Sequence, residues 1–310
     1  MTPSYEIRLI APSGYPHNPE AMARGIARLE EAGHRVQGKD VLERRELRFA
    51  GSDAERAADI NALADASGPL PDVVLAIRGG YGAHPLLPML DYDGLRARLG
   101  DTPVALVGHS DFTALQCALF TRSGLVTLGG PMLGPDFGAP ELDAQTWEHF
   151  WATLTADEGR ATWSTPAAPA LDVQGTLWGG NLAMLTSLVG SPFFPEIDGG
   201  ILFVEDVAEP AFRVERMLYH LLHAGVLARQ KALVIGDFTS YRTTEYDNGY
   251  DLDATFERIA AAAGIPIVHG LPFGHDAAKF TLPFGAPGRL TVADGTAVLT
   301  FNGHPRPKTP

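Results

Sequence analysis

The sequence predicts an α/β protein of two domains, with a parallel sheet in the first domain and a smaller, mixed α/β second domain. In the first half, short apolar runs alternate with segments of helical period, as in a parallel sheet covered by helices. The second half mixes further buried strands with helices and ends in a hairpin signal. The chain has 310 residues, which exceeds one average domain of roughly 100–200 residues, so two domains are expected.

In the first half, apolar runs predict strands at 5–14, 34–42, 72–82 and 102–111. Helical period predicts helices at 18–34, 52–66 and 111–124. A Ser/Asp pair opens the second of these helices, and glycine ends the first and the third. The runs at 72–82 and 102–111 end in small or polar residues. Two loops are therefore expected at strand carboxyl ends, where open α/β sheets bind ligands.

The second half is expected to begin after a connection at 155–172, which is rich in Ala, Thr and Pro and lacks an apolar period. The predicted domains are thus 1–160 and 170–310. Residues 175–190 read as a short strand, a Gly-Gly-Asn turn and a helix. Apolar runs predict further strands at 199–207, 231–238 and 265–274, and helical period predicts helices at 212–225 and 251–264. Residues 289–303 are two alternating runs around Asp294-Gly295, which predicts a hairpin.

Composition and charge exclude several classes of protein. Hydrophobic residues make 45% of the chain and charged residues 20%, which is typical of a globular protein. The net charge of −13 argues against nucleic acid or an anionic lipid surface as a partner. No apolar run approaches the roughly 18 residues of a membrane span, and the first residues lack the pattern of a signal peptide. With Cys117 as its single cysteine, the chain is expected to be cytoplasmic, and that thiol to be buried.

Ser110 is the first candidate for chemistry. It lies in V-G-H-S-D between a predicted strand and a predicted helix, where a serine is exposed and helix N–H groups face a bound carbonyl oxygen. The G-x-S-x-G of a nucleophile elbow is incomplete, because Phe112 replaces the second glycine. Taken alone, the segment fits a helix cap by Ser110 or Asp111 better than a nucleophile.

A serine nucleophile needs a base and a carboxylate that orients the base. His275 follows a buried strand in L-P-F-G-H-D, and Glu205 ends the apolar run GILFVE. Taken singly, His275 reads as a surface histidine and Glu205 as a solvated strand terminus. Their shared placement with Ser110 at strand ends favours a triad. His109 is a poor base, because neighbouring side chains on such a turn diverge.

Other motifs carry weaker signals. The loop R-G-G-Y-G (78–82) would let the backbone approach a ligand, although tight-turn packing explains its glycines equally well. It does not match a nucleotide-binding motif. His220 and His223, spaced H-x-x-H, lack the H-E-x-x-H pattern and are interpreted as packing or surface residues. We expect no metal and no cofactor.

Several segments resemble the LD-carboxypeptidases of peptidoglycan recycling, in order along nearly the whole chain. They are IAPSGY (10–15), RGGYGA (78–83), GHSDFTALQC (108–117), GTLWGGNLAML (175–185), VED (204–206), RVERML (213–218) and FGH (273–275). The resemblance implies a flavodoxin-like N-terminal domain, of the class I glutamine amidotransferase type, and a smaller mixed C-terminal domain. It implies Ser110 as nucleophile, Glu205 as orienting carboxylate and His275 as base, with the backbone N–H groups of Gly80 and Asp111 as oxyanion hole.

The same resemblance implies a cytoplasmic serine carboxypeptidase acting on a muropeptide. It would remove the terminal D-Ala of the tetrapeptide by cutting the L,D bond after meso-diaminopimelate. Arg78 is the candidate for binding the terminal carboxylate, and the alternative is that it packs or pairs with Glu205 or another acid. Two other functions stay open: an immunity-type peptidase that cleaves a peptidyl-nucleotide antibiotic, and a non-catalytic muropeptide-binding module. A homodimer is expected from the family and from the Trp-bearing segment 147–151.

Overall fold

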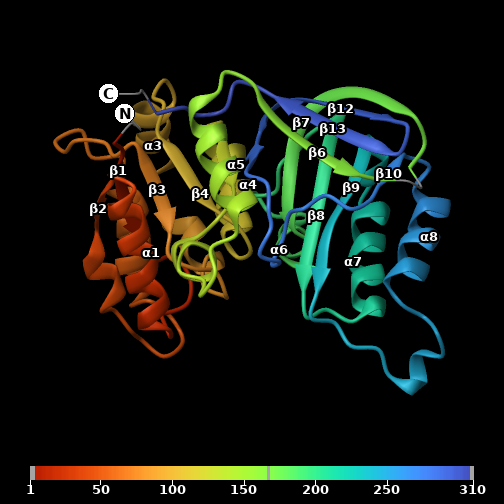
Figure 1. Ribbon diagram of the computed structural model, residues 1–310, viewed down its shortest axis with the longest axis horizontal. Helices are drawn as coiled ribbons and strands as arrows, with labels where there is room; N and C mark the ends of the chain where they lie inside the picture. Colours follow the sequence, from red (N-terminus) through yellow and green to blue (C-terminus); the bar gives the residue numbers. More distant parts are fainter. Residues whose placement is uncertain (1–3, 166–167, 308–310) are drawn as a thin grey trace.

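The computed structural model describes residues 4–165 and 168–307, which fold around two sheets (Figure 1). The first sheet contains, in spatial order, β2 (Arg35–Gln37), β1 (Glu6–Ile10), β3 (Val73–Ala76), β4 (Ala105–Gly108), β5 (Thr127–Gly129) and β11 (Leu282–Phe284). Strands β1 to β5 are parallel, and β11 pairs antiparallel with β5. The order 2-1-3-4-5 is that of flavodoxin-like folds, so the predicted class is confirmed.

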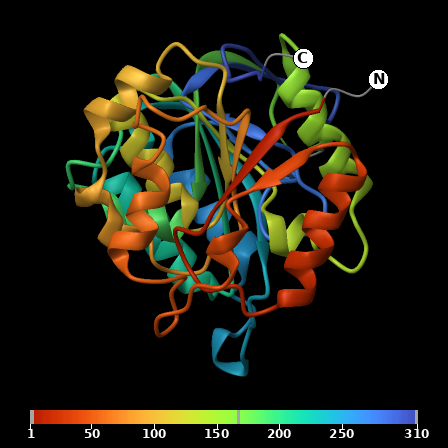
Figure 2. The same cartoon turned by 90° about the vertical axis from the view of Figure 1, so that its left-hand side faces the viewer.

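Helices cover both faces of the first sheet (Figure 2). One face is covered by α1 (Pro19–Glu31) and α5 (Ala144–Thr155), and the other by α2 (Asp53–Asn61), α3 (Tyr92–Leu99) and α4 (Phe112–Ser123). Ser52 begins α2 with a capping box, and Gly124 ends α4 in the left-handed conformation, as predicted. The short helical turns are η1 (Lys39–Leu42), η2 (His84–Met89), η3 (Leu133–Phe137), η4 (Leu227–Arg229) and η5 (Glu245–Asp247).

The second sheet is mixed, as expected. It contains, in spatial order, β10 (Ile267–Val268), β9 (Gln230–Thr239), β8 (Gly200–Val207), β7 (Leu171–Asn181), β12 (Ala286–Ala293), β13 (Thr296–Phe301) and β6 (Gly159–Ser164). The four strands β7 to β10 are parallel, whereas β12, β13 and β6 are antiparallel. One face carries α6 (Leu182–Leu188), α7 (Ala211–His223) and α8 (Leu252–Ala263).

One apolar cluster contains residues from both sheets. Helix α6 packs between α4 of the first sheet and α7 of the second, and Leu115, Leu185 and Leu218 of these helices belong to the same buried cluster. The second half of the chain also contributes a strand to the first sheet, because β11 pairs with the edge of β5. The division into domains at 1–160 and 170–310 stays a prediction.

Three segments differ from the sequence-based expectation. The strand expected over 34–42 is limited to β2, because the chain turns at Gly38, whose φ is 73°, and Lys39–Leu42 form η1. The expected connection at 155–172 contains β6, whose Gly159, Ala161 and Trp163 face the core in alternation. Small residues and a single tryptophan give this strand too weak an apolar pattern to be seen in the sequence. The strand expected over 265–274 is limited to β10, and the chain beyond it forms the loop that carries His275.

The predicted hairpin is confirmed. Asp294 and Gly295, with φ of 48° and 71°, connect β12 to β13. The tryptophans of 147–151 are partly buried against the core of the first sheet: Trp147 contacts Phe137, and Trp151 stacks on His34. The homodimer stays a prediction. Among the described residues, no helix combines the length and the apolar character that a bilayer span requires.

Candidate active site

Ser110 lies on the turn between β4 and α4. Its φ of 60° is in the left-handed region, which costs a residue with a Cβ roughly 1–2 kcal/mol. The turn is held by two hydrogen bonds, from Phe112 N–H to His109 O (3.2 Å) and from Thr113 N–H to Ser110 O (2.9 Å). In the described chain, neither Ser110 nor Asp111 caps the first turn of α4 through its side chain, so the alternative of a capping serine or aspartate is wrong. The strained turn therefore presents the hydroxyl of Ser110 at the carboxyl end of β4.

The side chain of Asp111 connects this turn to two other strand-end loops. Its Oδ2 accepts hydrogen bonds from Ser13 Oγ (2.6 Å) and from Ala83 N–H (2.9 Å). Ser13 follows β1 and Ala83 follows β3, so three segments meet at one buried carboxylate. Burial raises the pKa of Asp111. Gly80 adopts a φ of 112°, and among the described residues neither its N–H nor that of Asp111 donates to another group. Both N–H groups are thus free to bind a ligand oxygen.

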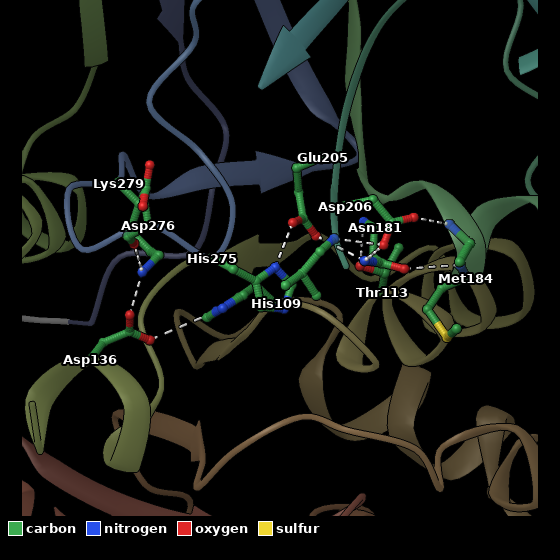
Figure 3. Close-up of polar contacts among 12 residues, drawn as sticks. His109, Thr113, Asp136, Asn181, Met184, Glu205, Asp206, His275, Asp276 and Lys279 are labelled. Atoms are coloured by element: carbon green, nitrogen blue, oxygen red, sulfur yellow. Dashed lines mark hydrogen bonds and ion pairs between the residues drawn. The ribbon is translucent and has the colours of Figure 1, made fainter. Parts of the chain in front are cut away.

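His275 and Glu205 are hydrogen-bonded. His275 Nδ1 lies 2.7 Å from Glu205 Oε2 (Figure 3), and Glu205 on β8 is fully buried. A carboxylate only accepts, so Nδ1 carries the proton and Nε2 of the neutral ring is a free acceptor. The preceding Gly274 has a φ of 149°, and a Cβ there would lie 3.0 Å from that of Asp237. Glycine therefore lets the chain turn tightly enough to bring the imidazole to the end of β8.

The charges around His275 keep its imidazole basic. Burial lowers the pKa of His275, but the hydrogen bond and the negative charge of Glu205 outweigh it, so the pKa lies above its ordinary value. The neighbouring Asp206 is different, because burial and the charge of Glu205 raise its pKa to about 6. Asn181, at the end of β7, donates its amide to Glu205 Oε1 (3.2 Å) and to Asp206 Oδ1 (3.0 Å).

His109 is held away from any role as base. Burial lowers its pKa to about 4, and its Nδ1 lies 2.9 Å from the carbonyl oxygen of Gly130. Since a carbonyl only accepts, Nδ1 carries the proton of the neutral ring. The ring packs edge-on against His275, with centroids 5.3 Å apart. This arrangement agrees with the expectation that His109 is a poor partner for Ser110.

Ser110 and His275 line one pocket of about 590 Å³, together with Arg78, Gly80 and Lys279. In the described chain no hydrogen bond joins Ser110 Oγ to His275, and such bonds often tighten only in the substrate complex. The structure thus brings Glu205 and His275 into contact and places Ser110 in the same pocket.

Arg78 projects into this pocket from the loop after β3. Its Nη1 donates to Tyr15 O (3.0 Å) and lies 2.7 Å from His17 Nδ1. Across the residues that the structure describes, no carboxylate is within ion-pair distance of this guanidinium, so the alternative pairing with Glu205 is not observed. Burial lowers the pKa of Arg78.

The remaining candidates lie outside this pocket. His220 and His223 are exposed on α7, and the described part of the chain contains no cluster of three His, Cys, Asp or Glu side chains suited to a metal ion. Cys117 is buried in α4, as expected, and burial raises the pKa of its thiol.

Comparison with known proteins identifies the family. The chain matches the LD-carboxypeptidase N-terminal domain over residues 7–130 and the LD-carboxypeptidase C-terminal domain over residues 174–290. It belongs to the LD-carboxypeptidase family. The chain is similar to muramoyltetrapeptide carboxypeptidase from Oxalobacter formigenes, whose crystal structure is known. The two sequences are 42% identical, and the structures superpose with a TM-score of 0.89 over 96% of this chain and 99% of the other.

Two curated proteins that are similar to this chain have names that indicate different activities. The murein tetrapeptide carboxypeptidase of Pseudomonas aeruginosa is 32% identical over 79% of this chain and 80% of its own length. The microcin C7 self-immunity protein MccF of Escherichia coli is 28% identical over 84% of this chain and 83% of its own length. This LD-carboxypeptidase is accordingly a hydrolase of the carboxypeptidase type.

Several polar residues of this LD-carboxypeptidase site were not predicted from the sequence. Asn181 stands in the Gly-Gly-Asn turn at a predicted strand end, a signal that could have indicated it. Ser13 lies in the IAPSGY segment, but nothing local shows that its partner is Asp111. The buried pair of Asp136 and Lys279 has no sequence signal, because its members are 143 residues apart.

Proposed function

We propose that this chain is a serine carboxypeptidase that releases the terminal D-Ala of murein tetrapeptides by cutting the L,D bond after meso-diaminopimelate. The hydrogen bond of Glu205 to His275, in a pocket shared with Ser110 on its left-handed turn, carries the proposal. This arrangement has the three parts that acyl transfer to serine needs: a nucleophile, a base and a group that orients the base. The family and the muramoyltetrapeptide carboxypeptidase relative support the choice of substrate.

In the proposed reaction, Nε2 of His275 takes the proton of the Ser110 hydroxyl as the oxygen attacks the carbonyl carbon of meso-diaminopimelate. The backbone N–H groups of Gly80 and Asp111 bind the oxyanion, and their freedom from other acceptors supports this role. The protonated imidazole then gives its proton to the amine of D-Ala, which leaves. Water, deprotonated by His275, hydrolyses the acyl-enzyme and restores Ser110.

A carboxypeptidase must also bind the terminal carboxylate of its substrate. We assign this role to Arg78, because it lines the same pocket and has no acidic partner in the described chain. A guanidinium binds a carboxylate best through two parallel hydrogen bonds. Arg78→Lys is therefore expected to raise KM for the tetrapeptide, and an unchanged KM would rule the assignment out.

The proposed setting is the cytoplasm, where peptidoglycan fragments are recycled. A single buried cysteine and an acidic chain suit a reducing, aqueous compartment. Confinement there would also separate the enzyme from the intact wall.

The proposal is tested by measuring D-Ala release from the tetrapeptide, with tripeptide and pentapeptide as controls. Ser110→Ala should lower turnover by about 10⁶-fold, as loss of a triad serine does elsewhere, while the circular dichroism spectrum stays the same. Retained turnover in Ser110→Ala would show that this serine is not the nucleophile. Release from no substrate by the wild-type protein would favour a non-catalytic muropeptide-binding module.

A second candidate function is an immunity-type peptidase that cleaves a peptidyl-nucleotide antibiotic. The similarity to the self-immunity protein MccF favours it. Both activities would use the same triad, so only substrates separate them. Efficient cleavage of an aminoacyl sulfamoyl adenosine, with no D-Ala release from the tetrapeptide, would establish the alternative.

A further inference from the structure

The loop that carries His275 is fixed by residues that belong to the first sheet's side of the molecule. Thr146, on α5, donates its hydroxyl to Ala277 O (2.7 Å) and accepts a hydrogen bond from Lys279 N–H (2.8 Å). The ammonium of Lys279 reaches the carboxylate of Asp136 on η3 and donates to Asp276 O (2.7 Å). Backbone groups of Ala277 and Lys279 are thus held from α5, and the Lys279 side chain connects Asp276 O of the same loop to Asp136 on η3. Figure 3 shows the Asp136–Lys279 contact beside the histidines.

We refer to Asp136, Thr146 and Lys279 as the clasp. All three are buried, and Lys279 and Thr146 are each only 1% exposed. Asp136 is itself fixed, because its other carboxylate oxygen accepts a hydrogen bond from Met132 N–H (2.7 Å). The clasp therefore connects η3 and α5, on the first sheet's side, to the loop that follows β10.

A contribution to folding stability does not by itself explain why Asp136 and Lys279 form a buried ion pair. Removing two charges from water costs several kcal/mol per ion, and apolar residues of similar volume are often as stable or more so. What an ion pair and directed hydrogen bonds provide, and apolar contacts do not, is one defined geometry for the loop. That geometry matters here because Ser110 follows β4 of the first sheet, whereas Glu205 is on β8 of the second.

We propose that Asp136, Thr146 and Lys279 are positioning residues that hold the His275 loop so that the imidazole faces Ser110. The inference rests on the proposed serine mechanism. Glu205 fixes the ring at Nδ1, and the clasp fixes the backbone just beyond it, so the two together set the direction of Nε2. A displacement of about 1 Å at a reacting group costs on the order of 100-fold in rate, so the clasp acts on kcat.

Thr146→Val is the sharpest test, because it removes both hydrogen bonds, keeps the volume and changes no charge. Its matched control is Thr153→Val, on the same helix and equally buried, whose hydroxyl contacts His149 instead of the 275–279 loop. We expect Thr146→Val to lower kcat for D-Ala release by about tenfold or more, with KM within about twofold of wild type. Thr153→Val should leave both constants within about twofold.

The charged arm of the clasp is tested in a double variant. Lys279→Met alone leaves a buried carboxylate without its partner and can prevent folding, so it is combined with Asp136→Asn, which keeps an acceptor for Met132. We expect a folded protein whose kcat is about 10–100-fold lower. If Lys279 instead bound substrate directly, KM would rise in the double variant while Thr146→Val stayed at wild-type activity, and the clasp would be refuted.

A second readout does not depend on the substrate. The groups facing the His275 ring are Glu205 and Asp206 on β8, Lys279 on its own loop and His109 from the serine turn. Thr146→Val alters none of these charges. A lower pKa of His275 in this variant, measured by NMR and assigned with His275→Gln, would therefore report a loosened contact with Glu205. A residue with a merely structural role would leave that pKa unchanged.

The outcomes separate the clasp from the proposed function. If the wild-type protein releases no D-Ala, the proposed function fails, and the titration of His275 in Thr146→Val still decides the clasp. The clasp is refuted by an unchanged kcat and an unchanged His275 pKa in Thr146→Val, or by equal losses in Thr153→Val.

Discussion

Gly79 packs directly against Ser110, the proposed nucleophile. Replacing Gly79 with alanine therefore tests whether the activity depends on this close packing. An alanine Cβ at this position would lie 2.9 Å from Ser110 Cβ and 3.0 Å from Ser110 Oγ. Ordinary van der Waals contact begins at 3.4 Å, so the new methyl would be about 0.5 Å too close. Since Ser110 Cβ sits on a strained backbone turn, either the serine shifts or the 78–82 loop retreats with the N–H of Gly80.

Both movements separate the proposed nucleophile from the proposed oxyanion hole, so kcat should fall. A displacement of about 1 Å costs on the order of 100-fold, and half of that displacement suggests a loss of about 10–100-fold, or roughly 1.4–2.7 kcal/mol in the barrier. The overpacking itself should lower the free energy of unfolding by about 1–3 kcal/mol. D-Ala release gives kcat, and urea denaturation gives the stability.

Gly68→Ala is the matched control, because nothing lies within 4 Å of a Cβ built there. We expect it to leave kcat unchanged. A kcat within about twofold of wild type in Gly79→Ala, or an equal loss in Gly68→Ala, would show that close packing of Gly79 on Ser110 does not set the rate.

Three further outcomes test the carboxylates of the site. The wild-type kcat/KM should fall as the pH drops through a value above 6.5, the ordinary pKa of histidine. The reason is that Glu205 raises the pKa of His275, and the proposed base works only when it is unprotonated. A flat profile between about pH 5 and 8 would contradict this prediction. Glu205→Gln should lower kcat by about 10⁴-fold and move the acidic fall of kcat/KM to lower pH. If the midpoint of that fall does not move, Glu205 is not what raises the pKa of His275. Asp111→Ala leaves Ser13 Oγ and Ala83 N–H without their acceptor, so urea denaturation should show a free energy of unfolding lower by about 1–3 kcal/mol; an unchanged value would mean that the two loops are held otherwise.

Local features of the fold were predictable because their causes lie within a few residues. The hairpin at Asp294-Gly295, the capped start of α2 and the glycine end of α4 each follow from backbone preferences of the residues present. Elements with weak local patterns were not predictable. Strand β11 has three residues, and it forms because the edge of β5 offers hydrogen bonds to a segment some 150 residues later in the chain.

In the candidate site too, some features were predictable from local sequence and others were not. Ser110, Glu205 and His275 were predicted at strand ends, where parallel sheets expose their loops. The sequence could not show that Asn181 bridges two carboxylates or that Asp111 binds Ser13 and Ala83. Nor could it show that Arg78 has no acidic partner within residues 4–165 and 168–307. These contacts join side chains from different loops, so their partners are decided by how the strands are ordered.

The α/β class, the family resemblance and the candidate site residues could be predicted from the sequence alone, because propensity, apolar period and motif spacing are local properties. How those residues meet depends on the folded chain. It buried Glu205 against His275, joined the two sheets through one apolar cluster and through β11, and held the histidine loop by Lys279 and Asp136 across 143 residues. The physical reason is that burial, desolvation and ion pairing depend on neighbours in space, and the folded chain alone supplies them.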